Sequence, residues 1–278
     1  MNAVHSIPLL YTISGFGVGL LVGLTGVGGG SLMTPLLILL FGIHPATAVG
    51  TDLLYAAVTK SAGSVVHGLN GTVNWQIVRR LALGSVPMTI LTIACLGYFD
   101  IKGEGARQLI GAVLAFALLF TAVTLIFRNR IAAYYAPRVG AFSPNRIAAL
   151  TIVAGGVLGI LVSISSVGAG AIGVTALVLL YPKVPIRQII GSDIVHAVPL
   201  TLVAGIGHWL LGSVDWQIFT ALIFGSIPGI LVGSYAAARF PEKALRIVLA
   251  LTLLAVATKL SFGLIPTPDV LAAQIPHH

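Results

Sequence analysis

Charged side chains are scarce in this sequence: Asp, Glu, Lys and Arg make up only 8% of its 278 residues. Soluble domains carry about 25% charged residues, so a chain this poor in charge cannot cover a surface that faces water. Cysteine is also scarce, and the lone Cys95 excludes an intrachain disulfide. Because no Cys/His cluster and no Ser/His/Asp set stands out, the sequence predicts no metal site, no cofactor and no enzyme activity.

Apolar residues are abundant instead: they make up 57% of the chain, and the mean hydropathy is +1.05. Runs of membrane-spanning length recur at 110–127, 147–164, 218–238 and 247–264, each near the roughly 20 residues that cross about 30 Å of hydrocarbon. The sequence therefore predicts an all-α polytopic membrane protein in a lipid bilayer. The net charge of +8 comes from basic residues at helix ends, which favours lipid headgroups over nucleic acid as a partner.

The chain repeats itself. Residues 50–90 align without a gap on residues 191–231 at an offset of 141. The identical pairs include Gly50/Gly191, Asp52/Asp193, His67/His208, Gly71/Gly212, Trp75/Trp216, Gln76/Gln217, Ile77/Ile218, Gly84/Gly225, Ser85/Ser226 and Pro87/Pro228. At an offset of 140, VGGG at 27–30 also meets VGAG at 167–170. This self-similarity indicates an internal duplication.

Each half is predicted to hold five helical segments, of which the second is short. The expected segments are 8–24, 31–43, 46–68, 75–98 and 107–127, then 147–164, 171–182, 186–210, 216–238 and 244–263. The longest polar stretch, 128–146, is predicted to be a cytoplasmic loop that links a first membrane repeat, 1–127, to a second, 147–278.

The distribution of basic residues predicts the orientation in the membrane. If the 128–146 linker is cytoplasmic, most other Lys and Arg residues also fall at cytoplasmic helix ends, and only Lys102 and Arg107 lie outside. Five crossings per half then place the halves in opposite orientations. The prediction is a five-plus-five inverted-repeat helical bundle, with short, glycine-broken helices at the repeat interface and both termini outside the cytoplasm. If the short segments were re-entrant, the halves would instead be parallel.

Glycine-rich stretches, TGVGGGS at 25–31 and SSVGAGA at 165–171, interrupt equivalent places in the two halves. Broken helices at matching positions indicate the substrate site of inverted-repeat transporters. Such turns expose backbone N–H groups next to the positive end of a helix, which favours a small anion as substrate. The predicted binding residues here are Thr25, Gly28, Gly29, Gly30, Ser31, Ser165, Ser166, Gly168 and Gly170. The alternative is that the glycines only pack helices closely.

Two acidic residues follow in the motifs GTD and GSD. Asp52 and Asp193 lie five or six residues into predicted membrane helices, where a carboxylate is expensive and functional by default. Each could accept a coupling proton or bind a cation, or could instead cap the helix N-terminus. The neighbouring hydroxyls of Thr51 and Ser192 join the predicted substrate-binding set.

Lys60 breaks the symmetry, because Thr201 stands at its equivalent position. It lies eight residues past Asp52, on nearly the same helix face. Lys60 could compensate Asp52, but we favour a role in binding an anionic substrate. His196, one turn beyond Asp193 and opposite Tyr55, is a weaker candidate for handling protons.

Further polar and aromatic residues mark the predicted helix ends. Four of them, Trp75, Gln76, Trp216 and Gln217, form paired WQI motifs that are typical of membrane-interface anchors, with gating as the alternative. His67 and His208 are predicted to lie at the interface as well.

Several motifs together resemble the sulfite exporter TauE/SafE family over nearly the full length. They are the glycine loops, P-x-x-A-V-G-T (Pro45, Ala48, Val49, Gly50, Thr51), the run VPIRQIIGS at 184–192, and the turn G-x-V-x-W that ends at Trp75 and Trp216. The resemblance implies a bacterial inner-membrane permease for sulfur-containing anions such as sulfite or sulfonates, including sulfoacetate and sulfolactate. Many family members carry GTS where this chain has GTD and GSD.

The expected function is a secondary transporter, an exporter of a small sulfur-containing anion coupled to the proton-motive force. The alternative is an anion channel or an uncoupled membrane scaffold. Ionisable groups near paired broken helices favour the carrier, since a scaffold needs none at that depth. A homodimer is an assembly compatible with such a bundle.

Overall fold

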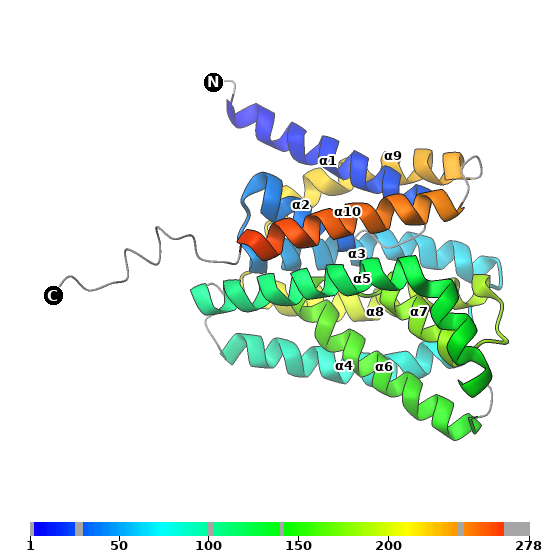
Figure 1. Cartoon of the computed structure of the whole chain (residues 1–278). Coiled ribbons are helices and arrows are strands. Elements are labelled where there is room, and N and C mark those ends of the chain that lie inside the picture. The colour runs from blue at the N-terminus through cyan, green and yellow to red at the C-terminus, as the bar shows by residue number, and fades with distance from the viewer. Residues whose placement is uncertain (1–2, 26–29, 99–102, 140–141, 238–241, 264–278) are drawn as a thin grey trace.

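The computed structural model describes residues 3–25, 30–98, 103–139, 142–237 and 242–263, and the only regular secondary structure in these ranges is α-helix (Figure 1). The helices of the first half are α1 (Ala3–Thr25), α2 (Gly30–Phe41), α3 (Pro45–Leu69), α4 (Trp75–Tyr98) and α5 (Glu104–Val139). Those of the second half are α6 (Pro144–Ser165), α7 (Ala171–Leu180), α8 (Ile186–Leu210), α9 (Trp216–Ala237) and α10 (Glu242–Gly263).

Length and composition confirm the predicted all-α polytopic membrane class. Five of the described helices are long and apolar enough to cross a bilayer: they lie in α4, α5, α6, α8 and α9. The predicted short segments are short, because α2 has 12 residues and α7 has 10. At 1.5 Å per residue these helices are about 18 and 15 Å long, roughly half of the hydrocarbon thickness.

The 128–146 stretch differs from its prediction as a polar loop. Helix α5 continues to Val139, so most of this stretch is helical. Polarity alone was a poor guide here, because arginine, alanine and tyrosine are all compatible with a helix that continues beyond the membrane. The break before α6 falls at Ser143, whose hydroxyl accepts a hydrogen bond from the N–H of Arg146 at 3.4 Å, with Pro144 as the first helical residue.

Glycines bring α1 and α9 into direct backbone contact. A side chain at Gly19 would meet the backbone oxygen of Ser226 at 2.5 Å, and one at Gly229 would collide with the backbone of Phe16. Small residues allow helices to approach this closely in lipid, where packing replaces the hydrophobic effect as the driving force. Helix packing therefore explains many of the glycines.

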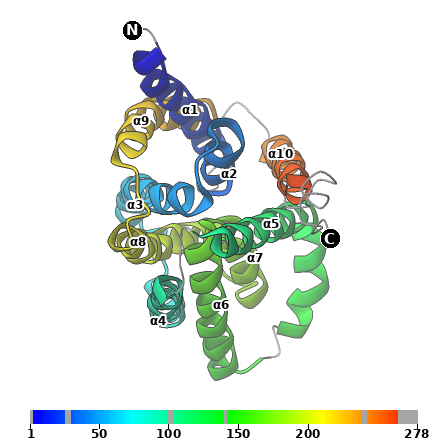
Figure 2. The same ribbon diagram turned by 90° about the vertical axis from the view of Figure 1, so that its left-hand side faces the viewer.

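Helices α4 and α6 repeat this arrangement in equivalent positions. A side chain at Gly159 would meet the backbone oxygen of Ser85 at 2.5 Å, and one at Gly84 would collide with the backbone of Ile152. Each pair joins the first helix of one half to the fourth helix of the other, so the two halves interlock. Figure 2 shows α3 and α8 side by side, with the α1–α9 pair on one side and the α4–α6 pair on the other.

Two glycines in α1 provide a matched test of this packing. We expect Gly19→Ala to destabilise the fold by about 1–3 kcal/mol, because its methyl group would push against the α9 backbone. Gly17→Ala should change stability by less than about 1 kcal/mol, because a side chain there meets nothing within 4 Å. Thermal unfolding of the two detergent-purified variants measures both effects, and equal destabilisation would contradict the assigned contact.

Candidate functional site

Helices α3 and α8 pack against each other at the centre of the molecule. The start of each helix lies next to the turn that follows the end of the other. A side chain at Gly50, near the start of α3, would collide with the backbone oxygen of Ser213, just after α8. A side chain at Gly191, near the start of α8, would collide with the backbone oxygen of Thr72, just after α3. The two helices therefore run antiparallel.

Hydrogen bonds reinforce both of these contacts between a helix start and a turn. The Thr51 hydroxyl accepts a bond from the N–H of Asp215 at 3.0 Å, and the Ser192 hydroxyl accepts one from the N–H of Asn74 at 2.8 Å. Both hydroxyls are fully buried. Their observed contacts hold the turns of the opposite half, and the substrate role of Thr51 and Ser192 stays a prediction.

Asp52 lies in the interior of α3, and its side chain is fully buried. One carboxylate oxygen accepts a hydrogen bond from the Thr34 hydroxyl of α2 at 2.5 Å. The other oxygen has no hydrogen-bond partner among the described residues. The carboxylate as a whole lies close to Ser166. Since α3 begins at Pro45, Asp52 lies beyond the first turn and does not cap the helix.

Asp193 occupies the same place in α8, which begins at Ile186. The side chain is fully buried, and neither of its oxygens has a hydrogen-bond partner among the described residues. The carboxylate presses against the backbone of Gly173 in α7, where a side chain would collide with it, and lies close to the backbone of Gly170. A buried carboxyl group with so few partners is costly, which makes Asp193 a candidate functional residue.

Lys60 reaches from α3 to the loop between α6 and α7. Its ammonium donates a hydrogen bond to the Ala169 carbonyl at 3.4 Å, and only 9% of the residue is exposed. Its charge interacts with both Asp52 and Asp193, but none of the three groups forms an ion pair within 4.0 Å among the described residues. The structure therefore brings the predicted cation and both carboxylates into one cluster, which we call the Asp–Lys–Asp cluster.

The loop against this cluster has a non-helical backbone. Ser166 has a φ of 59°, Gly168 of 130° and Gly170 of 117°, conformations that favour glycine. The Gly168 carbonyl accepts hydrogen bonds from the N–H groups of Ile172 and Gly173, both at 3.1 Å, at the start of α7. Irregular backbone in a membrane protein is tolerated inside the protein or beside a cavity, which fits a binding site.

The predicted serines of this loop have different surroundings. Ser165 is bonded within its own segment, because its hydroxyl donates to Leu161 at 2.7 Å and accepts from the N–H of Val167 at 3.2 Å. The Ser166 hydroxyl is buried without a hydrogen-bond partner among the described residues. Ser166 is therefore the loop hydroxyl that lies against the Asp52 carboxylate.

The equivalent loop of the first half was predicted to contribute to the same site. Gly28 and Gly29 lie outside the described residues, Thr25 is the last residue of α1, and Gly30 is the first of α2. Ser31, one residue into α2, is buried. The pairing of the two loops stays a prediction.

His196 lies against α4. Its Nε2 atom is hydrogen-bonded to the Ser85 hydroxyl at 2.8 Å, and Nδ1 is buried without a partner among the described residues. Tyr55 and Ser226 occupy the equivalent positions of the other half and lie close to each other. Since both pairs sit one turn beyond an aspartate, His196 remains a candidate for proton handling.

Aromatic residues at the start of α4 and α9 lie largely at the surface. Trp75 is 62% exposed and Trp216 is 48% exposed, and Gln76 and Gln217 are exposed as well. This exposure suits the predicted role of interface anchors. His208 was predicted at the interface too, but this prediction was wrong: the side chain is fully buried and bonded to the Ser163 carbonyl at 2.9 Å. The carbonyl satisfies Nε2, whereas Nδ1 is buried without a hydrogen-bond partner among the described residues.

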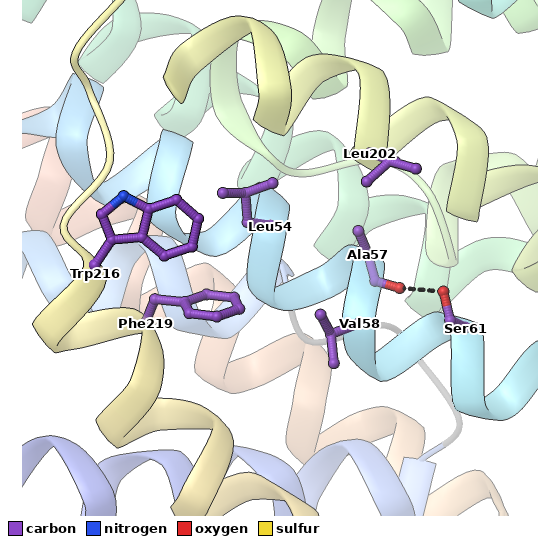
Figure 3. Close-up of a pocket in the computed structure, with 7 residues that line it drawn as sticks. All are labelled: Leu54, Ala57, Val58, Ser61, Leu202, Trp216 and Phe219. Atoms are coloured by element: carbon purple, nitrogen blue, oxygen red, sulfur yellow. Dashed lines mark hydrogen bonds between the residues drawn. The ribbon is translucent and has the colours of Figure 1, made fainter. Parts of the chain in front are cut away.

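A separate pocket of about 150 Å³ lies between α3, α8 and α9 (Figure 3). Its lining carries no charge, and its one polar side chain, Ser61, donates to the Ala57 carbonyl at 2.7 Å. The pocket thus offers nothing to balance an anion. The lining residues are Leu54, Ala57, Val58, Ser61, Leu202, Trp216 and Phe219.

Comparison with known families is decisive. The family described as sulfite exporter TauE/SafE matches residues 11–260. The chain belongs to this family. It is therefore a multi-pass protein of a membrane transporter family, and nothing in its TauE/SafE membership indicates an enzyme.

Relatives of this TauE/SafE protein carry transporter names. The chain is 39% identical over 249 residues to a protein of Bacillus subtilis named "Probable membrane transporter protein YjnA", covering 89% of this chain and 97% of that protein. It is 30% identical over 243 residues to a "Probable membrane transporter protein" of Xylella fastidiosa, covering 84% and 86%. It is 27% identical over 241 residues to YdhB of Bacillus subtilis, covering 85% and 93%. No solved structure matches.

Sequence reasoning missed one residue of the candidate site. The hydroxyl of Thr34, in α2, fixes the orientation of Asp52. The other residues of this helix are mainly apolar. The signal was a hydroxyl residue directly before Pro35 in this helix. Its partner could not be identified without the fold.

Proposed function

We propose that this chain is a secondary transporter that moves a small sulfur-containing anion, such as sulfite or an organosulfonate, across the bacterial inner membrane. The proposed direction is export, as the family description states, and transport is proposed to be coupled to the proton-motive force. The single observation that carries this proposal is that Lys60, which contacts the loop of the broken α6–α7 segment, interacts with both Asp52 and Asp193.

The anion-binding part of the proposal rests on Lys60. Its ammonium has one long hydrogen bond, to a loop carbonyl, and no ion pair within 4.0 Å among the described residues. A compact ammonium binds a tetrahedral or pyramidal oxyanion as a point charge. The Ser166 hydroxyl and the backbone of the loop are additional polar groups near the same place.

The coupling part of the proposal rests on the two carboxyl groups. Asp52 and Asp193 are the carboxyl groups of the cluster. Each can gain or lose a proton when the charge paired with Lys60 changes. Intramembrane carboxyl groups of this kind form proton relays in pumps and transporters. An anion channel would need the cation without the two carboxyl groups, so the cluster favours coupled transport.

Transport by the purified protein tests the function. Proteoliposomes loaded with unlabelled anion should take up labelled sulfite or sulfonate by counterflow, and a pH-sensitive dye should report accompanying proton movement. Flux without any proton movement would favour the channel alternative. Absence of flux for every sulfur-containing anion offered would refute the transporter assignment for these substrates.

The orientation is a further proposal. The basic residues of 128–146 favour the cytoplasmic side, and both termini are then outside. A periplasmically active reporter fused after residue 278 should be active, and the same reporter inserted after residue 143 should be inactive. Activity at the second position would reverse the proposed topology.

The backbone of the α6–α7 loop offers a direct test of its role in binding. Gly170 has a φ of 117°, so Gly170→Ala forces an unfavourable conformation that costs about 1–3 kcal/mol or moves the loop. Because Asp193 lies close to this backbone, we expect substrate affinity to fall about tenfold or more. Gly17→Ala in α1 is the control, because a side chain at this position meets nothing within 4 Å. Unchanged affinity in a folded Gly170→Ala protein would remove the loop from the site.

A further inference from the structure

The charges of the Asp–Lys–Asp cluster can be counted, because few other ionisable groups face it. Thr34 of α2, the loop residues 166–170 and Gly173 of α7 pack against the two aspartates and Lys60, and none of them ionises. Among the described residues, the other titratable groups that interact with the cluster are Tyr55, which interacts with Asp52, and His196, which interacts with Lys60. Two carboxyl groups and one ammonium therefore dominate its charge.

Without a ligand, the cluster is neutral only when one of the two carboxyl groups carries a proton. The ammonium of Lys60 compensates one ionised aspartate, and a second ionised aspartate would leave a net negative charge away from water. An uncompensated buried charge costs several kcal/mol, so the protonated form of the second carboxyl group is the stable one.

A bound anion changes this balance, and here the argument rests on the anion binding proposed above. When a monoanion becomes the counter-ion of Lys60, the aspartate that held this place is left uncompensated. Neutrality returns if that carboxylate takes one proton from water, so that both aspartates are protonated. We propose that Asp52, Lys60 and Asp193 bind one monoanion and one proton together, with the anion replacing a carboxylate as the counter-ion of Lys60.

This proposal defines the substrate class. A sulfonate or hydrogen sulfite carries one negative charge and leaves the loaded cluster neutral. A dianion such as sulfate leaves it negative, because no third carboxyl group faces the cluster among the described residues. Each cycle moves an anion and a proton in the same direction without net charge, so net export requires an internal anion gradient that exceeds the proton gradient.

Calorimetry of the purified full-length protein tests the proposal with ethanesulfonate as the probe. This sulfonate remains a monoanion throughout the working range, so any pH dependence belongs to the protein. Titrations in two buffers with different ionisation enthalpies give the number of protons taken up on binding. We expect about one proton per ethanesulfonate and an affinity that rises up to about tenfold for each pH unit of acidification. Sulfate should bind at least about tenfold more weakly.

Variants assign the proton to the cluster. Asp52→Asn and Asp193→Asn should each still take up about one proton, because the remaining carboxylate then holds Lys60 alone. His196→Gln should also take up about one proton, because the proton goes to a carboxyl group and not to the imidazole. Asp215→Asn is the matched control: it makes the same chemical change at the start of α9, where Asn74 is the equivalent residue, and should behave as the unchanged protein.

Each outcome of these experiments either supports or overturns the inference. Binding of ethanesulfonate without proton uptake, or binding that weakens on acidification, would overturn the inference and leave the proposed anion transport intact. Loss of proton uptake in His196→Gln would place the proton on His196 and also overturn it. If this variant does not fold, the proton count of the unchanged protein and its preference over sulfate still decide. Absence of binding by both ethanesulfonate and sulfite would remove the proposed function together with the inference.

Discussion

Lys60→Met should weaken the binding of a sulfonate by about a hundredfold or more, while the protein still inserts into the membrane. The ammonium is the cation of the cluster, and loss of one partner of a buried charge pair costs about 3–5 kcal/mol, which corresponds to a factor of a hundred or more in affinity. Methionine keeps most of the side-chain length, so packing around α3 changes little. Equilibrium binding to protein in nanodiscs measures the effect.

Two further variants separate charge at this position from charge in general. Lys259→Met removes an ammonium from the exposed side of α10 and should leave the affinity unchanged. Lys60→Arg should retain only part of the affinity, because a planar guanidinium does not reproduce a compact point charge. A sulfonate affinity in Lys60→Met equal to that of the unchanged protein would exclude Lys60 from the binding site.

The fold was predictable because it rests on patterns within each half. The boundaries of α4, Trp75–Tyr98, agree with the segment predicted from apolar length, and α3 and α8 begin and end within one residue of prediction. Helix α5 was missed beyond residue 127, since hydropathy detects the membrane and not the helix. Polar residues can continue a helix into water without any change in periodicity.

The site was predictable only in part, because contacts between halves leave no trace in local spacing. The spacing of eight residues placed Lys60 on the same face as Asp52, and the structure adds Asp193 from α8. The hydroxyls of Thr51 and Ser192 were assigned to the substrate because they adjoin the aspartates. Their actual partners, the N–H groups of Asp215 and Asn74, lie in the opposite half. A duplicated sequence shows which residues are equivalent but not which of them meet.

The second large effect is the contribution of Lys60 to the stability of the folded protein. Lys60→Met leaves Asp52 and Asp193 buried without their cation, and these groups must take up protons or strain the packing. We expect the single variant to lose about 3 kcal/mol of stability at neutral pH, seen as a lower midpoint in thermal unfolding. Removing a carboxyl group as well should restore much of this loss.

The two possible double variants should differ, because the aspartates have different partners. Asp52 keeps the hydrogen bond from Thr34, whereas Asp193 has no hydrogen-bond partner among the described residues. Lys60→Met with Asp193→Asn should therefore recover more thermal stability than Lys60→Met with Asp52→Asn. Neither should regain sulfonate binding, because the cation is still absent. Full recovery of affinity in either double variant would reduce Lys60 to a counter-ion of the fold and leave the anion to be bound by the loop alone.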